Sequence, residues 1–521
     1  MRQGLSKSLI ERVLDGKPKW TINELENKFP PRNLPDGAMI TRFAPSPTGF
    51  MHLGNLYSML IDYKLAKQSG GIFFIRVEDT DTKRKVEGAL DVILKTAERF
   101  KFTPDEGPYY QSERRDIYHS VVSEMLADGR AYPCFLSVDE MEEIRKKQTA
   151  EGLVTGIYGK YAKWKDASEE EIVQKLDENI IPSIRLYSFG SKERRLFCKD
   201  AVRGSISFPE NEEDVVLIKS NDGLPTYHFA HVVDDHFMHT THVIRGEEWL
   251  PSLPLHIQIF NILKWISPAY IHTSTLDTID IDTGKQRKLS KRKDRMANVD
   301  NFIRDGWPEE AVLEYLFNIL NSSYEENKAQ GKVKNIWDSE LKIKEIPKSG
   351  ALFDRKKLEW WSKEFIATMS VDELAEKIVQ YVNEYGEDQK EKIKDLDYLK
   401  RILSIERDDL KRIRKDFITW KQTLMEIDYF FKDPNIQDIE KINKDVLEKF
   451  IASFDINDPK DLWWDKIVKI ASELGIRNGE AAMSLRVALT DRTATPDLYS
   501  IMQVMGDKKV RERITSVVNK K

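Results

Sequence analysis

Two short segments of this chain carry side chains and turns that suit the binding of phosphate groups. Residues 42–55 read RFAPSPTGFMHLGN, and residues 288–292 read KLSKR. In the first segment, prolines and Gly49 shape a tight turn whose backbone N–H groups can face an anion near the following helix. His52 can donate a hydrogen bond to a phosphate oxygen, and Gly54 leaves space for an adenine ring against the backbone.

The second segment places four hydrogen-bond donors for phosphate within five residues: Lys288, Ser290, Lys291 and Arg292. A basic loop of this kind is ordinarily a solvated surface feature. Together with the first segment, we interpret it as a loop that closes over a triphosphate. There it would stabilise the negative charge that develops as pyrophosphate leaves.

The elements around the first segment are those of a nucleotide-binding unit. Residues 39–43 are predicted to form a strand, and 56–68 have helical periodicity before the Gly70-Gly71 stop. Residues 72–77 (IFFIRV) form an apolar run typical of a strand buried on both faces. Strand, turn, helix and strand in this order open a βαβ unit of the Rossmann type.

The chain of 521 residues is too long for one hydrophobic core, so we expect about three to five domains. Apolar stretches at 215–218, 242–244 and 270–274 are predicted to resume the parallel sheet after an insertion. From 350 onward the pattern is helical, and a capping box at 370–373 opens one helix. The predicted parts are an N-terminal extension (1–38), a Rossmann-type domain (39–134 and 201–262), an inserted subdomain (135–200), a region carrying KLSKR (263–349) and a helical region (350–521).

Composition excludes some classes of protein. Charged residues make up 32% of the chain and the formal net charge is −5, so an RNA partner would require local basic patches. Only Cys134 and Cys198 are present, which excludes a disulfide framework and fits a reducing cytoplasm. No apolar stretch reaches the roughly 18 residues of a membrane span, and we expect no membrane association and no targeting peptide.

Six ordered motifs carry a resemblance to a known family. They are TRFAPSPTGFMHLGN (41–55), FIRVEDTD (74–81), PYYQSER (108–114), DGLPTYHFAHVVDDH (222–236), HVIRGEEWL (242–250) and KLSKR (288–292). In this order they resemble bacterial-type glutamyl-tRNA synthetases, which are class I aminoacyl-tRNA synthetases. The resemblance implies an α/β fold: a Rossmann-type catalytic domain with an inserted subdomain for the tRNA acceptor end, a stem-contact region and an all-helical anticodon-binding region.

The resemblance also implies roles for single positions. Glutamate would contact Arg42, Ala44, Ser46, Glu78, Tyr227, His231 and Arg245. ATP would contact Pro45, Thr48, Gly49, His52, Gly54, Asn55, Leu289, Ser290, Lys291 and Arg292. His52, Lys288 and Lys291 would carry the developing phosphate charge together with Mg2+. At position 231, where this chain has histidine, many relatives carry Asn or Ser.

The chemistry of these side chains agrees with the implied substrate. Arginine at 42 and 245 suits carboxylates, because the guanidinium fork pairs with them bidentately. Glu78 suits the substrate ammonium, and a site of this kind would reject glutamine, whose amide does not replace the charge. Taken singly, Glu78 and Arg245 are equally compatible with an ordinary structural ion pair.

We predict no protein-bound metal other than the Mg2+ that accompanies ATP. Some relatives hold zinc in the insertion, but here the corresponding positions are Cys134, Leu136, Tyr161 and Lys163, of which only the cysteine is a ligand. The histidines at 228, 231, 236, 239 and 242 are predicted to have structural or substrate-contacting roles rather than to bind a metal.

A basic and aromatic cluster in the helical region is a candidate tRNA contact. It contains Lys411, Arg412, Arg414 and Lys415, followed by Phe417 and Trp420. Cations beside exposed aromatics hold single-stranded RNA loops. The same pattern also describes a charged surface above a buried aromatic stripe.

The predicted activity is a two-step, ATP-dependent attachment of glutamate to the 3′ end of tRNA-Glu by a cytoplasmic monomer. Charging of tRNA-Gln as well stays open. The alternatives are a glutaminyl-tRNA synthetase, whose anticodon region is typically a β-barrel, and a non-catalytic tRNA-binding relative. A truncated paralogue that modifies a tRNA base would lack the last ~170 residues, which are present here.

Overall fold

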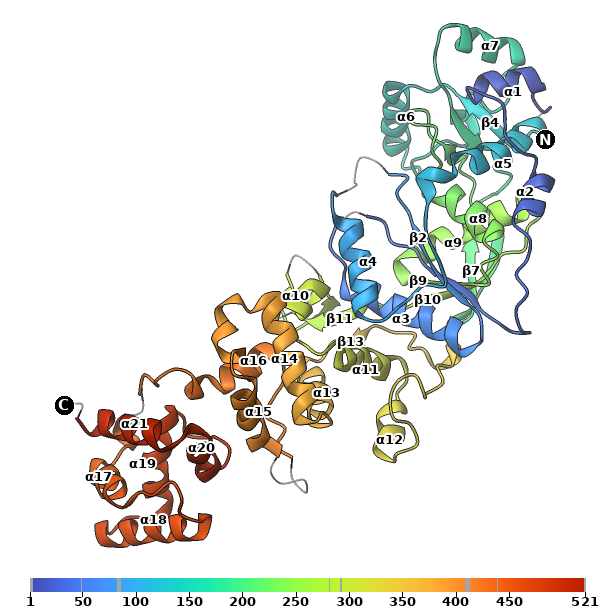
Figure 1. The fold of residues 1–521 in the computed structure, drawn as a ribbon. Coiled ribbons are helices and arrows are strands. Elements are labelled where there is room, and N and C mark those ends of the chain that lie inside the picture. The colour runs from blue at the N-terminus through green and yellow to red at the C-terminus, as the bar shows by residue number, and fades with distance from the viewer. Residues whose placement is uncertain are drawn as a thin grey trace. The chain divides into compact units, whose positions relative to one another are not determined.

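The structure is a computed structural model that describes residues 3–47, 49–81, 86–280, 282–290, 293–407, 413–437 and 439–519. The chain forms two compact units (Figure 1). The first comprises Met1–Asp300 and Leu316–Phe353, and the second comprises Asn301–Tyr315 and Asp354–Lys521. None of the helices in these described segments has both the length and the apolarity required to cross a membrane.

Parallel strands form the centre of the first unit. β1 pairs in parallel with β2 and β2 with β3, whereas β9 pairs in parallel with β10, and β10 with β6. Thr241 hydrogen-bonds to Ile40, which places β9 beside β1. The parallel strands are β1 (Ile40–Phe43), β2 (Ile72–Val77), β3 (Glu106–Tyr110), β6 (Arg195–Asp200), β9 (His242–Gly246) and β10 (Ala269–Thr273). An additional strand, β7 (Gly204–Pro209), pairs antiparallel with β6. These strands form two hydrogen-bonded sheets, β1-β2-β3 and β7-β6-β10-β9, which adjoin at β1 and β9. The carboxyl ends of β1, β2, β9 and β10 therefore lie along one edge, where open α/β sheets bind their ligands.

The opening βαβ unit is confirmed. Between β1 and β2 lies α3 (Leu53–Gln68), which packs against β1, β2 and β9. Leu56, Leu60 and Leu65 on this helix are fully buried, as the helical periodicity predicted. Further helices of the first unit are α4 (Ala89–Arg99), α5 (Arg115–Ala127), α8 (Tyr227–Phe237), α9 (Leu253–Leu263) and α12 (Tyr324–Ala329).

A small antiparallel sheet lies outside the parallel strands. It has the order β4-β5-β8 and is accompanied by two helices; its members are β4 (Ala131–Cys134), β5 (Ser183–Leu186), β8 (Val216–Ile218), α6 (Val138–Ala150) and α7 (Glu169–Asp177). The expectation that 215–218 resumes the parallel sheet is wrong, because β8 pairs with β5 instead. An apolar run predicts a buried strand, but it does not specify the partner strand.

The N-terminal extension forms two helices. They are α1 (Lys7–Val13) and α2 (Ile22–Lys28), and α2 begins with a capping box at Thr21. α1 packs against α5 and α7, and α2 against α5. Leu9, Ile10 and Leu25 are buried there, so the extension joins the core of the first unit.

A further small sheet leads into the KLSKR segment. Its order is β12-β11-β13, formed by β11 (Leu276–Ile279), β12 (Gln286–Lys288) and β13 (Ala351–Leu352). β12 ends at Lys288, and its antiparallel pairing with β11 sets the point at which the chain leaves the sheet. Immediately after it, the Leu289 N–H donates to the carbonyl oxygen of Leu276.

The second unit is helical, as predicted. Its helices include α13 (Arg355–Ala367), α14 (Val371–Tyr385), α15 (Leu396–Ser404), α16 (Trp420–Glu426), α17 (Lys444–Ser453), α18 (Lys460–Leu474), α19 (Asn478–Thr490), α20 (Leu498–Met505) and α21 (Asp507–Asn519). The helices α10 (Val299–Arg304) and α11 (Glu309–Leu320) contain residues of both units. The predicted capping box is present at the start of α14, where Ser370 and Glu373 bond reciprocally.

Candidate active site

A cavity of about 380 Å³ opens at the carboxyl edge of the parallel strands. Residues at or just beyond the ends of β1, β2, β9 and β10 line it, together with the start of α3. Its volume lies within the range of about 300–1,000 Å³ that is usual for small-molecule sites. Most of the predicted substrate contacts lie around it: Arg42, Ala44, Pro45, Ser46, Gly49, His52, Gly54, Asn55, Glu78, Tyr227, Arg245 and Lys288.

The remaining predicted residues fall into two groups. His231 is fully buried behind the cavity, and Leu289 and Ser290 follow Lys288 without lining it. Thr48, Lys291, Arg292, Lys411 and Arg412 lie outside the described residues, so their predicted roles stay predictions.

His52 joins the two phosphate-binding segments. It is the N-cap of α3, and its Nδ1 accepts a hydrogen bond from the Gly54 N–H at 2.9 Å. Because Nδ1 accepts, Nε2 carries the proton and donates to the carbonyl oxygen of Leu289 at 3.1 Å. The Nε2 donor predicted to serve a phosphate is therefore bonded to the KLSKR segment in this structure.

Lys288 stands at the mouth of the cavity. Its side chain is about half exposed, and its Nζ lies 3.1 Å from Oε1 of Glu248. Glu248 also lines the cavity. An exposed pair of this kind contributes little stability and opens readily, so Lys288 is free to exchange its partner for a phosphate.

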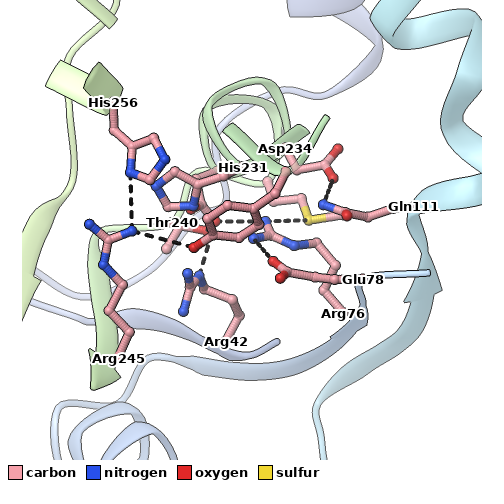
Figure 2. Close-up of polar contacts among 12 residues, drawn as sticks. Arg42, Arg76, Glu78, Gln111, His231, Asp234, Thr240, Arg245 and His256 are labelled. Carbon is pink, nitrogen blue, oxygen red and sulfur yellow. Dashed lines mark hydrogen bonds and ion pairs between the residues drawn. The ribbon is translucent and has the colours of Figure 1, made fainter. Parts of the chain in front are cut away.

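Two arginines and two carboxylates form a largely buried network, and Arg42 and Glu78 of this network line the cavity (Figure 2). Asp235 Oδ1 lies 3.1 Å from Arg42 Nε and 2.7 Å from Arg76 Nη1. Arg76 Nη2 lies 3.3 Å from Glu78 Oε1. The charges of this group cancel when both carboxylates are ionised.

The two carboxylates of this network differ in their proton affinity. Burial opposes ionisation of Asp235, but Arg42 and Arg76 hold its pKa well below the ordinary value. Burial raises the pKa of Glu78, and the same arginines only partly offset that effect. A second cation near Glu78, such as a substrate ammonium, would favour its charged form.

Arg245 lies outside this balanced group and is itself almost fully buried. Its Nε donates to His272 Nε2 at 2.9 Å, and its Nη1 lies 3.1 Å from His256 Nδ1 and 3.4 Å from the Tyr227 hydroxyl. Its Nη2 is buried without a hydrogen-bond partner. Within the described segments no carboxylate lies at ion-pair distance from Arg245, so its charge is not compensated there.

The histidines of α8, of the turn after it and of the start of β9 have protein partners. His228 contacts His256, and His231 lies between Asp235 and Tyr270. His236 stacks on Trp265, and His239 and His242 contact Phe29 and Thr241. Burial lowers the pKa of His228 to about 4 and that of His231 to about 3. Within the described segments, no group of three or more His, Cys, Asp or Glu side chains is arranged to hold a metal ion.

Some site residues were missed by sequence reasoning. Glu248 and Trp249 line the cavity and belong to the quoted HVIRGEEWL motif, but no role was given to them. Residues 273–276 line it as well, because they follow the carboxyl end of β10. That position after a predicted strand was the signal available in the sequence.

The described cations of the predicted tRNA-binding cluster form ion pairs within the second unit. Arg414 pairs with Asp416, and Lys415 with Glu364. Phe417 and Trp420 are 4% and 3% exposed and belong to the hydrophobic core. The base-stacking interpretation is therefore wrong for these two aromatics, and the buried-stripe alternative holds.

Comparison with known proteins agrees with this geometry. Residues 38–360 match the model of the catalytic domain of class I tRNA synthetases for glutamate and glutamine (E and Q), and residues 373–518 match an anticodon-binding domain. The chain is 40% identical to a glutamate–tRNA ligase of Clostridium perfringens, over 97% of this chain and 99% of that protein. It is 43% identical to one of Acetivibrio thermocellus, over 93% and 95%.

Solved structures give the same result. A glutamate–tRNA ligase of Elizabethkingia meningosepticum, crystallised in complex with its amino acid, matches with a TM-score of 0.77 at 28% identity, over 92% of this chain and 99% of that one. The chain thus has the fold of a class I aminoacyl-tRNA synthetase. Within that class it belongs to the glutamate–tRNA ligase family.

Proposed function

We propose that this chain activates glutamate with ATP and transfers it to the 3′ end of tRNA-Glu. The observation that carries the proposal is the uncompensated Arg245 beside a charge-balanced network. Burial raises the pKa of Asp62, another carboxyl that lines the cavity, well above its ordinary value and so favours its neutral form. The cavity then has one surplus positive charge, which suits glutamate, whose zwitterion has one surplus negative charge. Glutamine has none, and it would leave the buried guanidinium without a counter-charge.

Glutamate is oriented by two charged groups that line the cavity. Glu78 receives the substrate ammonium, and Arg245 receives the side-chain carboxylate with the Tyr227 hydroxyl beside it. Arg42 lines the same cavity while its Nε is bonded to Asp235, so it contributes charge from a fixed position. The substrate α-carboxylate is then left to face ATP.

The reaction needs no protein nucleophile. An oxygen of the glutamate α-carboxylate attacks the α-phosphorus of ATP, the bond to the β-phosphate oxygen breaks, and pyrophosphate leaves. A terminal ribose hydroxyl of tRNA then attacks the carbonyl carbon of the mixed anhydride, and AMP leaves. The protein supplies positioning and charge stabilisation.

The phosphates of ATP are held by the two segments that His52 joins. Lys288 and, from its sequence position, Lys291 would neutralise charge on the leaving pyrophosphate. Among the described residues, the cavity offers separate carboxylates such as Glu78 and Glu248, and no group of three or more metal ligands. Mg2+ suits such a site when phosphate oxygens and water supply most of its ligands.

The tRNA would contact several parts of the chain. The small antiparallel sheet with α6 and α7 is proposed to receive the acceptor end, and the helical region matched to the anticodon-binding domain to receive the anticodon. Arg414 and Lys415 are proposed as phosphate contacts, for which they would give up their surface ion pairs.

ATP–pyrophosphate exchange tests the proposed activation step. Exchange should depend on glutamate, and glutamine should support it at least a hundredfold less well, in the presence of tRNA-Glu. Omitting tRNA shows whether activation requires it. No glutamate-dependent exchange under either condition would overturn the proposed function.

A further inference from the structure

Arg245 is held by a set of acceptors that contains no acid. It has five N–H donors, of which those on Nε and Nη1 face His272, His256 and the Tyr227 hydroxyl. An arginine accepts no hydrogen bond, so each ring nitrogen that faces it presents a lone pair. The tautomers of both histidines follow from this geometry.

His272 is fixed from its other side by Asp200. Because His272 Nε2 accepts from Arg245, its proton is on Nδ1, which lies 2.8 Å from Asp200 Oδ2. Asp200 also accepts from the backbone N–H groups of His272, Val202 and Arg203. The carboxylate is thus anchored at the end of β6, and it holds the ring from β10 against the arginine from β9.

His256 has the opposite tautomer to His272. Its Nδ1 accepts from Arg245, so its Nε2 carries the proton and lies 2.9 Å from Nδ1 of His228. Figure 2 shows the contact of Arg245 with the His256 ring. Protonating either ring on the nitrogen that faces Arg245 would remove the acceptor and place two cations in contact.

We propose that His272 and His256 are positioning residues for glutamate specificity, which hold Arg245 in place through neutral acceptors so that its charge is left for the substrate carboxylate. This rests on the proposed function and deepens it. An acidic partner would hold the guanidinium equally well, but it would cancel the charge that distinguishes glutamate from glutamine. Burial lowers the pKa of both imidazoles, in agreement with the tautomers deduced from the geometry.

The two histidines use different ring nitrogens toward Arg245, and this allows a matched test. The side-chain amide of Gln reaches the place of Nε2, and that of Asn the place of Nδ1. His272→Gln therefore keeps an acceptor for Arg245, whereas His272→Asn does not. At position 256 the order is reversed: His256→Asn keeps the acceptor, and His256→Gln loses it.

The test measures glutamate-dependent ATP–pyrophosphate exchange for all four variants. We expect His272→Asn and His256→Gln to raise the KM for glutamate about 10- to 100-fold, the effect of losing a hydrogen bond to a buried charge. His272→Gln and His256→Asn should raise it by less than about fivefold. The KM for ATP should change less than about twofold in all of them.

The reversal of order between the two positions separates positioning from packing. If only side-chain volume mattered, Gln would be the milder replacement at both positions, and that result would overturn the proposal. Equal increases in the KM for ATP and for glutamate would overturn it as well. Loss of exchange in the unsubstituted chain would instead refute the proposed function, and thermal melting of each variant identifies any that fails to fold.

Discussion

At the scale of single residues, the charge state of the cavity decides the substrate. Arg42 and Arg76 are matched by Asp235 and Glu78, and the surplus charge is on Arg245. An unpaired buried cation is costly for the folded chain, so its presence beside a cavity indicates a ligand of opposite charge.

Arg245→Gln should remove this surplus charge. The kcat/KM for glutamate should fall about a hundredfold or more, whereas the much lower value for glutamine should change little, because only glutamate uses the charge. Competition between the two amino acids in the exchange assay measures the ratio. Arg194→Gln, which changes an exposed arginine paired with Glu210, is the matched control. Unaltered discrimination in Arg245→Gln would remove this residue from the specificity role.

Lys288→Ala should affect the rate of activation more than glutamate binding. The lysine lines the cavity and has only an exposed partner, Glu248, so it is available to the pyrophosphate that forms. We expect the exchange rate to fall roughly a hundredfold, as when one donor to a transition state is removed. The KM for glutamate should stay within about twofold. Lys285→Ala, three residues earlier and exposed, should have no effect, and a normal rate in Lys288→Ala would contradict the assignment.

At the scale of elements, one histidine serves both the start of α3 and the loop that follows β12. His52 accepts from Gly54 as the helix cap and donates to Leu289 as the bridge. The same ring thus stabilises a helix and couples two segments that are over two hundred residues apart in the sequence.

His52→Asn should separate these two roles. Asparagine keeps an acceptor at the place of Nδ1 and is a good N-cap, but it does not reach Leu289. The melting temperature of His52→Asn should therefore stay close to that of the unsubstituted chain, while its rate of ATP–pyrophosphate exchange falls by tenfold or more. His52→Ala should lose both the cap, at a cost of about 1 kcal/mol, and the rate. An Asn variant as active as the native chain would show that the bridge to Leu289 has no part in activation.

The sequence allowed prediction of those elements whose signals are local. β1, α3 and β2 follow from an apolar run, a helical period and a turn, and α14 from its capping box. The pairing of β8 with β5 depends on a distant strand, and no local pattern encodes it.

The site was predictable to a similar degree. Motif residues such as Arg42, Glu78 and Arg245 do line one cavity. The acceptors His256 and His272 were missed because each is a single histidine in an apolar element. Their contact with Arg245 depends on the fold, and no local sequence pattern indicates it.

At the scale of the whole molecule, buried histidines should make the first unit sensitive to acid. Burial lowers the pKa of His228 to about 4, with Arg245 adding to the effect, and that of His231 to about 3 against the opposing effect of Asp235. As pH falls, these two histidines bind protons near pH 6.5 in the unfolded chain but only at lower pH in the folded chain. The free energy of unfolding therefore falls as pH falls from about 6.5 towards 4.

Urea unfolding at pH 7.5 and pH 5 measures this loss. Each of the two histidines should account for about 2 kcal/mol, since pH 5 lies about 1.5 units below the ordinary pKa. His228→Asn should lose correspondingly less stability between the two pH values. A native chain that is equally stable at both would show that these imidazoles are protonated in the folded state.

The amino-acid specificity of this chain is measured by aminoacylation of tRNA-Glu with glutamate or glutamine, each in the presence of ATP. We expect the native chain to form glutamyl-tRNA, with glutamine at least a hundredfold less efficient, and Arg245→Gln to lose most of this preference. The same assay with tRNA-Gln shows whether a second tRNA is accepted. Equal charging with glutamine, or a preference for glutamate that survives in Arg245→Gln, would show that the charge of Arg245 does not select the substrate.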